Sequence, residues 1–133
     1  MKRILVADDE THILNVVSIK LSNAGYQVDT AEDGAEAYRA ALAHPPDLLI
    51  TDYQMPNLSG VELCAKLAAD EPTRFIPTIL LTARGYSISP QDKTTAGIKR
   101  VIDKPFSPRE VLACVEELLA GVEAERPMAE SCI

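Results

Sequence analysis

The chain has 133 residues, of which 47% are hydrophobic and 25% are charged, and its formal net charge is -7 at pH 7. This length and composition predict one soluble globular domain with an ordinary core. The acidic balance disfavours direct binding to nucleic acid or to an anionic membrane, because no basic stripe is available to displace counterions. No apolar stretch has the length of a signal peptide or a membrane span, so we expect a cytoplasmic, protein-binding module without membrane insertion.

The cysteines agree with a reducing compartment. Cys64 and Cys114 fall on apolar faces of predicted helices, where cysteine is usually a small buried hydrophobe, and Cys132 lies near the end of the chain. Three cysteines cannot all pair, and their spacing matches no zinc pattern. A structural metal or a disulfide framework is therefore not expected.

Short apolar runs alternate with helical periods along the chain, which predicts an α/β sheet with helices on both faces. The first, third and fourth runs are almost wholly apolar, as central parallel strands should be, while the second and fifth are typical of edges. The predicted strands lie near 3–7, 26–31, 47–51, 77–82 and 100–103.

Apolar stripes predict helices near 11–24, 34–43, 59–69 and 107–121, the last beginning with Ser107 as N-cap and Pro108 at its first position. A further helix near 90–96 is expected to be short, because Thr94 and Thr95 are poor helix formers and Gly97 follows. Periodicity is lost after residue 121. We therefore predict a domain at 1–121 and a tail without fixed structure at 122–133.

Polar residues stand where four of the apolar runs end. Asp8 and Asp9 follow the first run, Asp52 the third, Thr82 the fourth and Lys104 the fifth. The carboxyl ends of parallel strands share one edge of a sheet, where open α/β folds bind ligands. Three carboxylates, a hydroxyl and an amine are therefore expected to meet in one crevice.

The charge of this crevice predicts its chemistry. Three carboxylates and one ammonium leave a net charge of about -2, so the carboxylates repel one another at short range unless a cation is bound. Hard oxygen ligands in small number favour Mg²⁺, which typically takes one or two carboxylates together with phosphate oxygens. The sequence thus indicates Mg²⁺-dependent phosphoryl transfer.

Each of these residues also has an ordinary structural interpretation. Asp8 and Asp9 could cap the helix that follows them, and Asp52 could be a turn residue. Thr82 could simply end a strand, and Lys104 could be a solvated loop lysine. Their occurrence together, each ending an apolar run, favours the site.

Four motifs together resemble the receiver domain of two-component response regulators, over roughly residues 2 to 121. The resemblance implies a flavodoxin-like (βα)5 fold, a doubly wound five-stranded parallel sheet with strand order 2-1-3-4-5, and a stand-alone receiver similar to chemotaxis regulators. The motifs are Asp8-Asp9-Glu10, Asp52-Tyr53-Gln54-Met55-Pro56 with Gly60, Thr82-Ala83 and Lys104-Pro105-Phe106.

The same resemblance assigns roles in the acidic crevice. It implies phosphorylation of Asp52, with Mg²⁺ held by Asp9 directly, by Asp8 through a water, by Asp52 and by the backbone carbonyl of Gln54. Such a protein is a phosphoacceptor, which catalyses only its own phosphorylation and dephosphorylation and is not a turnover enzyme.

The resemblance also implies five positions that read the phosphoryl group or support the site. Thr82 and Ala83 would form the switch with Lys104, and Pro105 is a position where the family often has a cis peptide. Arg84 would line the approach of the attacking water.

One position departs from the family. Receivers commonly carry an aromatic residue three positions before the lysine, where this chain has Val101. The usual aromatic rotamer switch is therefore absent, and the output is expected to use backbone shifts instead.

The implied partners are a sensor histidine kinase or a phosphotransfer protein, which would read the surface around the first helix, and an unknown downstream protein. A phosphorylation-dependent dimer is left open. So are a degenerate receiver that acts as an unphosphorylated scaffold, a Mg²⁺ phosphohydrolase and a flavodoxin-like nucleotide binder. A hydrolase of this kind would need a second Asp at the position of Gln54. A nucleotide binder would need a Gly-rich loop after the first strand, where this chain has acidic residues.

Overall fold

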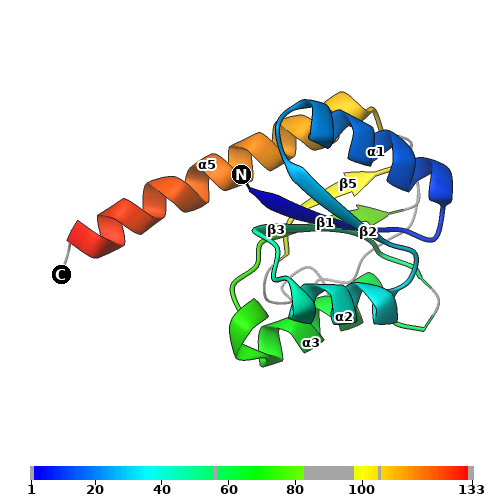
Figure 1. Cartoon of the computed structure of the whole chain (residues 1–133), viewed down its shortest axis with the longest axis horizontal. Coiled ribbons are helices and arrows are strands. Elements are labelled where there is room, and N and C mark those ends of the chain that lie inside the picture. The colour runs from blue at the N-terminus through cyan, green and yellow to red at the C-terminus, as the bar shows by residue number, and fades with distance from the viewer. Residues whose placement is uncertain (1, 56, 83–97, 105, 132–133) are drawn as a thin grey trace.

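The computed structural model describes residues 2–55, 57–82, 98–104 and 106–131. In the described residues, helices separate the first four of five strands, and a last helix follows the fifth strand (Figure 1). The elements are β1 Arg3–Ala7, α1 Thr11–Asn23, β2 Gln27–Ala31, α2 Gly34–Ala43, β3 Leu48–Asp52, α3 Gly60–Ala69, the 3-10 turn η1 Glu71–Thr73, β4 Thr78–Thr82, β5 Ile98–Asp103 and α5 Pro108–Ser131.

All five strands are parallel and stand in the order β2-β1-β3-β4-β5, which confirms the predicted topology and the two predicted edges. The strand registers place the carboxyl ends of neighbouring strands opposite one another. Ala7 lies opposite Thr51, and Thr82 lies opposite Asp103. The carboxyl ends of the strands therefore lie at one edge of the sheet, on the right-hand side of Figure 1, where the arrowheads point.

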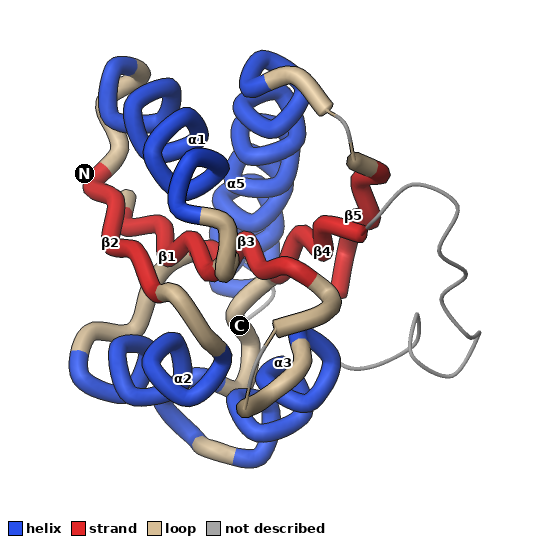
Figure 2. Tube along the Cα trace, turned by 90° about the vertical axis from the view of Figure 1, so that its right-hand side faces the viewer, coloured by secondary structure: helices blue, strands red, loops and turns tan. Residues whose placement is uncertain are grey.

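Helices cover both faces of the sheet, with α1 and α5 on one face and α2 and α3 on the other (Figure 2). Side chains alternate along each strand, so Ile4 and Val6 enter the first core while Leu5 and Ala7 enter the second. The central strands are buried from end to end. This two-sided burial explains why their sequences read as continuous apolar runs.

Side-chain caps begin three of the helices. Asp33 accepts a hydrogen bond from the backbone N–H of Glu36 at the start of α2. Ser59 and Glu62 form a reciprocal capping box at the start of α3, and Ser107 forms the same arrangement with Glu110 at α5. The prediction of Ser107 as the N-cap is confirmed.

The structure differs from the sequence prediction at the end of the chain. Helix α5 continues to Ser131, ten residues beyond its predicted end, and projects away from the body of the domain in Figure 1. Residues 122–131 contain several good helix formers, alanine and glutamate among them, together with Pro127, which is a poor one. They carry no apolar stripe, on whose loss the predicted end was based. The helix expected near 90–96 lies outside the described residues, and the domain boundary at 121 stays a prediction.

Candidate functional site

Backbone hydrogen bonds fix the loops at the carboxyl edge of the sheet. The N–H of Asp8 donates to the carbonyl of Ala31 at 3.1 Å, and the N–H of Lys104 donates to the carbonyl of Thr82 at 2.7 Å. Asp8 is thereby tied to the end of β2 and Lys104 to the end of β4. Backbone hydrogen bonds to the sheet thus position both side chains.

The Lys104 ammonium lies among three carboxylates. Its Nζ is 3.1 Å from Oδ2 of Asp8, 3.3 Å from Oδ1 of Asp52 and 3.2 Å from Oε1 of Glu10. Asp8, Asp52 and Lys104, at the carboxyl ends of three strands, therefore meet as the sequence predicted. Glu10 was not among the predicted site residues, although it belongs to the motif that follows β1.

Asp8 is the most enclosed member of this group. Its side chain has no exposed area, and its Oδ1 accepts a hydrogen bond from the backbone N–H of Glu10 at 2.9 Å. Its Oδ2 contacts the Lys104 ammonium as an ion pair but has no aligned hydrogen-bond donor. Burial raises the pKa of Asp8, against the lowering effect of the Glu10 N–H and of Lys104.

The electrostatics of Asp52 and Lys104 are coupled. Burial, followed by repulsion from Asp8, raises the pKa of Asp52 to about 6. Burial alone would lower the pKa of Lys104, but the Asp8 and Asp52 carboxylates outweigh it and hold that pKa above its ordinary value. Lys104 therefore stays charged at neutral pH, while Asp52 carries a destabilised negative charge.

A close approach of two backbones places Asp52 against the start of α3. A Cβ atom added at Gly60 would lie 2.3 Å from the carbonyl oxygen of Asp52, so only glycine fits without movement. The N–H of Gly60 also donates to the carbonyl of Tyr53 at 2.9 Å. The glycine thus lets the chain after β3 fold back and hold the Asp52 side chain at the edge of the sheet.

Carboxylate oxygens of Asp8, Asp9 and Glu10 lie within 4.8 Å of one another, as ligands of one metal ion can. Asp9 is exposed, and Gln54, whose carbonyl was predicted as a further ligand, is exposed in the loop after β3. Together with Asp52 these groups are oxygen donors only. The donor set and the unsatisfied Oδ2 of Asp8 fit Mg²⁺.

The remaining predicted residues divide into two groups. Thr82 is buried at the end of β4, and Val101 lies on edge strand β5 with 38% of its surface exposed. Ala83, Arg84 and Pro105 lie outside the described residues. Their predicted roles in the switch, in water access and in aiming the lysine stay predictions.

Residues 4–116 match the family described as the response regulator receiver domain. The chain belongs to this family. This membership confirms the resemblance seen in the motifs to a receiver domain of two-component signalling.

Two transcriptional regulators are similar to this receiver domain over most of its length. It is 37% identical to the alkaline phosphatase synthesis regulator PhoP of Bacillus subtilis, over 97% of this chain and 53% of PhoP. It is 38% identical to the phosphate regulon regulator PhoB of Pseudomonas aeruginosa, over 89% of this chain and 52% of PhoB. The chain thus spans about half the length of these relatives.

Solved structures of similar domains have the same fold. The chemotaxis response regulator CheY4 of Vibrio cholerae is 32% identical, with a TM-score of 0.81 over 88% of this chain and 98% of CheY4. A CheY-like receiver domain protein of Methanospirillum hungatei is 31% identical, with a TM-score of 0.83 over 94% of this chain and 98% of that one. In the described part of this receiver, no helix combines the length and the apolar character needed to cross a lipid bilayer.

The raised pKa of Asp52 predicts a pH-dependent stability in the absence of Mg²⁺. Between its ordinary pKa of 3.8 and about 6, the folded state keeps a proton on Asp52 that the unfolded chain has released. The contribution of Asp52 to the free energy of unfolding therefore falls as the pH rises through 6, by about 1–3 kcal/mol. In urea titrations with a chelator, Asp52→Asn should be more stable than wild type at pH 7.5, and by a smaller margin at pH 5. An equal margin at both pH values would contradict the raised pKa.

Proposed function

We propose that this receiver accepts a phosphoryl group on Asp52 from a histidine kinase or a phosphotransfer protein, in a Mg²⁺-dependent reaction. One observation carries the proposal: the Lys104 ammonium lies between Asp8 and Asp52, with Nζ–O distances of 3.1 and 3.3 Å. The ammonium can therefore contact a phosphoryl oxygen carried by Asp52 without leaving the site.

The reaction balances on the residues of the site. A carboxylate oxygen of Asp52 attacks the phosphorus of a phosphohistidine, the P–N bond breaks as the new P–O bond forms, and the imidazole leaves with its electron pair and gains a proton. The product is an acyl phosphate. Ionisation of Asp52 is favoured above its pKa of about 6, so the nucleophile is ready at neutral pH.

Asp8, Asp9, Asp52 and the carbonyl of Gln54 would hold Mg²⁺, which neutralises negative charge on the transferred group when bound. Lys104 would then contact one phosphoryl oxygen and stabilise the charge that develops in the transition state. Thr82, buried at the end of the neighbouring strand, would donate its hydroxyl to another oxygen.

The partner surfaces follow from exposure and charge. The kinase or phosphotransfer protein would dock on α1, where Val16 and Ile19 are exposed apolar residues. The output would go to another protein, because a net charge of -7 disfavours direct contact with nucleic acid. Val101 on β5 is exposed and has no aromatic ring that could move inward on phosphorylation. The output would therefore depend on shifts of the backbone.

Intact-protein mass spectrometry tests this function. Wild type incubated with acetyl phosphate and Mg²⁺ should gain the mass of one phosphoryl group, and a chelator should prevent the gain. No gain with Mg²⁺ present, together with no binding of a fluoride-based phosphoryl mimic, would overturn the proposal and leave the unphosphorylated scaffold as the function.

A further inference from the structure

The side chain of Glu10 does not take part in capping helix α1, although Glu10 is the N-cap residue. Its backbone carbonyl accepts hydrogen bonds from the N–H groups of Ile13 and Leu14. Its side chain makes no capping hydrogen bond and instead places Oε1 3.2 Å from the Lys104 ammonium. The second oxygen, Oε2, lies 3.6 Å from Nε2 of the exposed His12.

The contacts of Lys104 differ in how easily they can be exchanged. Three carboxylate oxygens lie 3.1, 3.2 and 3.3 Å from Nζ of Lys104 and crowd the ammonium group. A phosphoryl oxygen must therefore take the place of one of them. Asp8 is fully buried and Asp52 is 10% exposed, whereas Glu10 is 47% exposed and regains water when it lets go.

We propose that Glu10 is a positioning residue that holds Lys104 at the rim of the site and competes with the incoming phosphoryl group for its ammonium. This inference rests on the proposed function. The Glu10 contact is the first to be exchanged when a phosphoryl group enters, and the exchange slows phosphorylation. Glu10 also belongs to the cluster with Asp8 and Asp9, so its charge strengthens the attraction of the site for Mg²⁺.

A single variant, Glu10→Gln, should weaken Mg²⁺ binding and speed phosphorylation. Four carboxylates and one ammonium give the site a formal charge of -3, and Glu10→Gln reduces it to -2 while keeping the shape of the side chain. Mg²⁺ should bind more weakly because the field is weaker. At saturating Mg²⁺ the phosphoryl group should enter faster, because Lys104 is held less tightly and the donor anion is repelled less.

The experiment measures both quantities. The Mg²⁺ dissociation constant comes from an amide chemical-shift titration without phosphodonor, and the phosphorylation rate comes from mass spectrometry with acetyl phosphate. For Glu10→Gln we expect a dissociation constant and a rate at saturating Mg²⁺ that are each about two- to fivefold higher than in wild type. Glu10→Asp keeps the negative charge but is one methylene shorter, so its carboxylate lies farther from Lys104. This variant should bind Mg²⁺ as tightly as wild type and still be phosphorylated faster.

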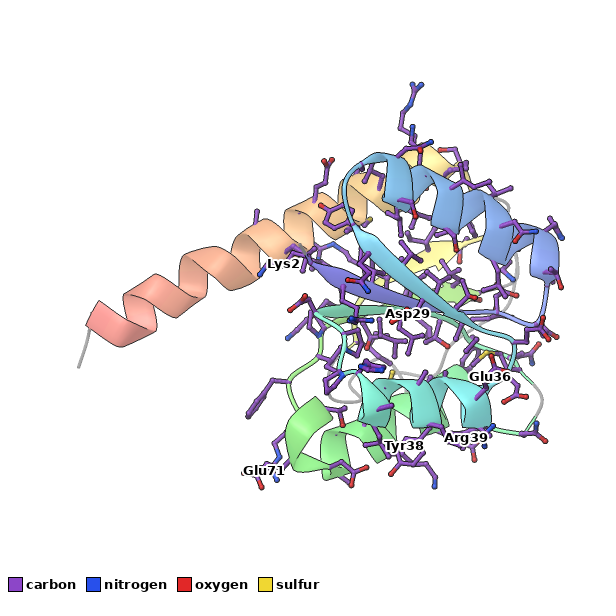
Figure 3. All side chains as sticks on the ribbon, in the orientation of Figure 1. Lys2, Asp29, Glu36, Tyr38, Arg39 and Glu71 are labelled. Atoms are coloured by element: carbon purple, nitrogen blue, oxygen red, sulfur yellow. The ribbon has the colours of Figure 1, made fainter. Side chains whose placement is uncertain are left out.

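The control is Glu71→Gln, which removes the same charge from an exposed residue of η1. Glu71 is labelled at the lower left of Figure 3, away from the carboxyl edge of the sheet. It should match wild type in both measurements. An unchanged or slower rate in Glu10→Gln, while wild type and Glu71→Gln are phosphorylated, would overturn the role of Glu10 alone. Failure of wild type itself to gain a phosphoryl group would instead overturn the proposed function.

Discussion

Replacing Asp52 with asparagine is expected to abolish phosphorylation by acetyl phosphate in the presence of Mg²⁺. The amide is almost the same size as the carboxylate, so the close packing of Gly60 against the backbone carbonyl of Asp52 is preserved. The amide cannot act as the nucleophile, and losing a covalent nucleophile lowers rates by about 10³-fold or more. Intact-protein mass spectrometry over a time course measures the loss.

Asp103→Asn is the matched control, since it removes one negative charge from an exposed residue next to Lys104. It should be phosphorylated like wild type. If Asp52→Asn gained a phosphoryl group at a rate near that of wild type, another residue would be the acceptor, and peptide mapping would identify it. A folded Asp52→Asn variant with an unchanged circular dichroism spectrum is required for the comparison.

The sequence predicts the strands and their polar ends well, for a physical reason. Central parallel strands are covered on both faces, so their apolar runs are long and stop where the chain reaches the carboxyl edge of the sheet. Asp8, Asp52 and Lys104 mark those stops, and the structure brings their side chains together. The order of the strands came from the resemblance to receivers, since apolar runs alone do not say which strand pairs with which.

Contacts made by long side chains at the surface could not be predicted in the same way. Glu10 follows Asp8 and Asp9 in a motif that reads equally well as the start of a helix, and nothing in the sequence says that its carboxylate reaches Lys104, 94 residues away. Helix α5 shows another limit. Its predicted end at 121 was based on apolar periodicity, which indicates packing against a core. Such periodicity does not reveal a helix that continues beyond the core.

Removing the charge of Lys104 should uncouple metal binding from phosphoryl transfer. In Lys104→Met the carboxylates of Asp8 and Asp52 lose their counter-charge, so the Mg²⁺-free protein should be about 3 kcal/mol less stable at pH 7.5. Mg²⁺ should bind roughly five- to tenfold more tightly, because the site becomes more negative. The phosphorylation rate at saturating Mg²⁺ should nevertheless fall about 10²- to 10³-fold, since the group that stabilises the developing charge is gone.

Thermal unfolding with and without Mg²⁺ measures the first two effects, and the mass-spectrometric rate measures the third. Lys99→Met, an exposed lysine on β5, is the control and should leave all three quantities near wild type. A Lys104→Met protein that bound Mg²⁺ less tightly would mean that the lysine organises the metal ligands more than it repels the metal. A rate near that of wild type would mean that Lys104 only balances charge in the resting site, because a group that stabilises the transition state cannot be lost without slowing the reaction.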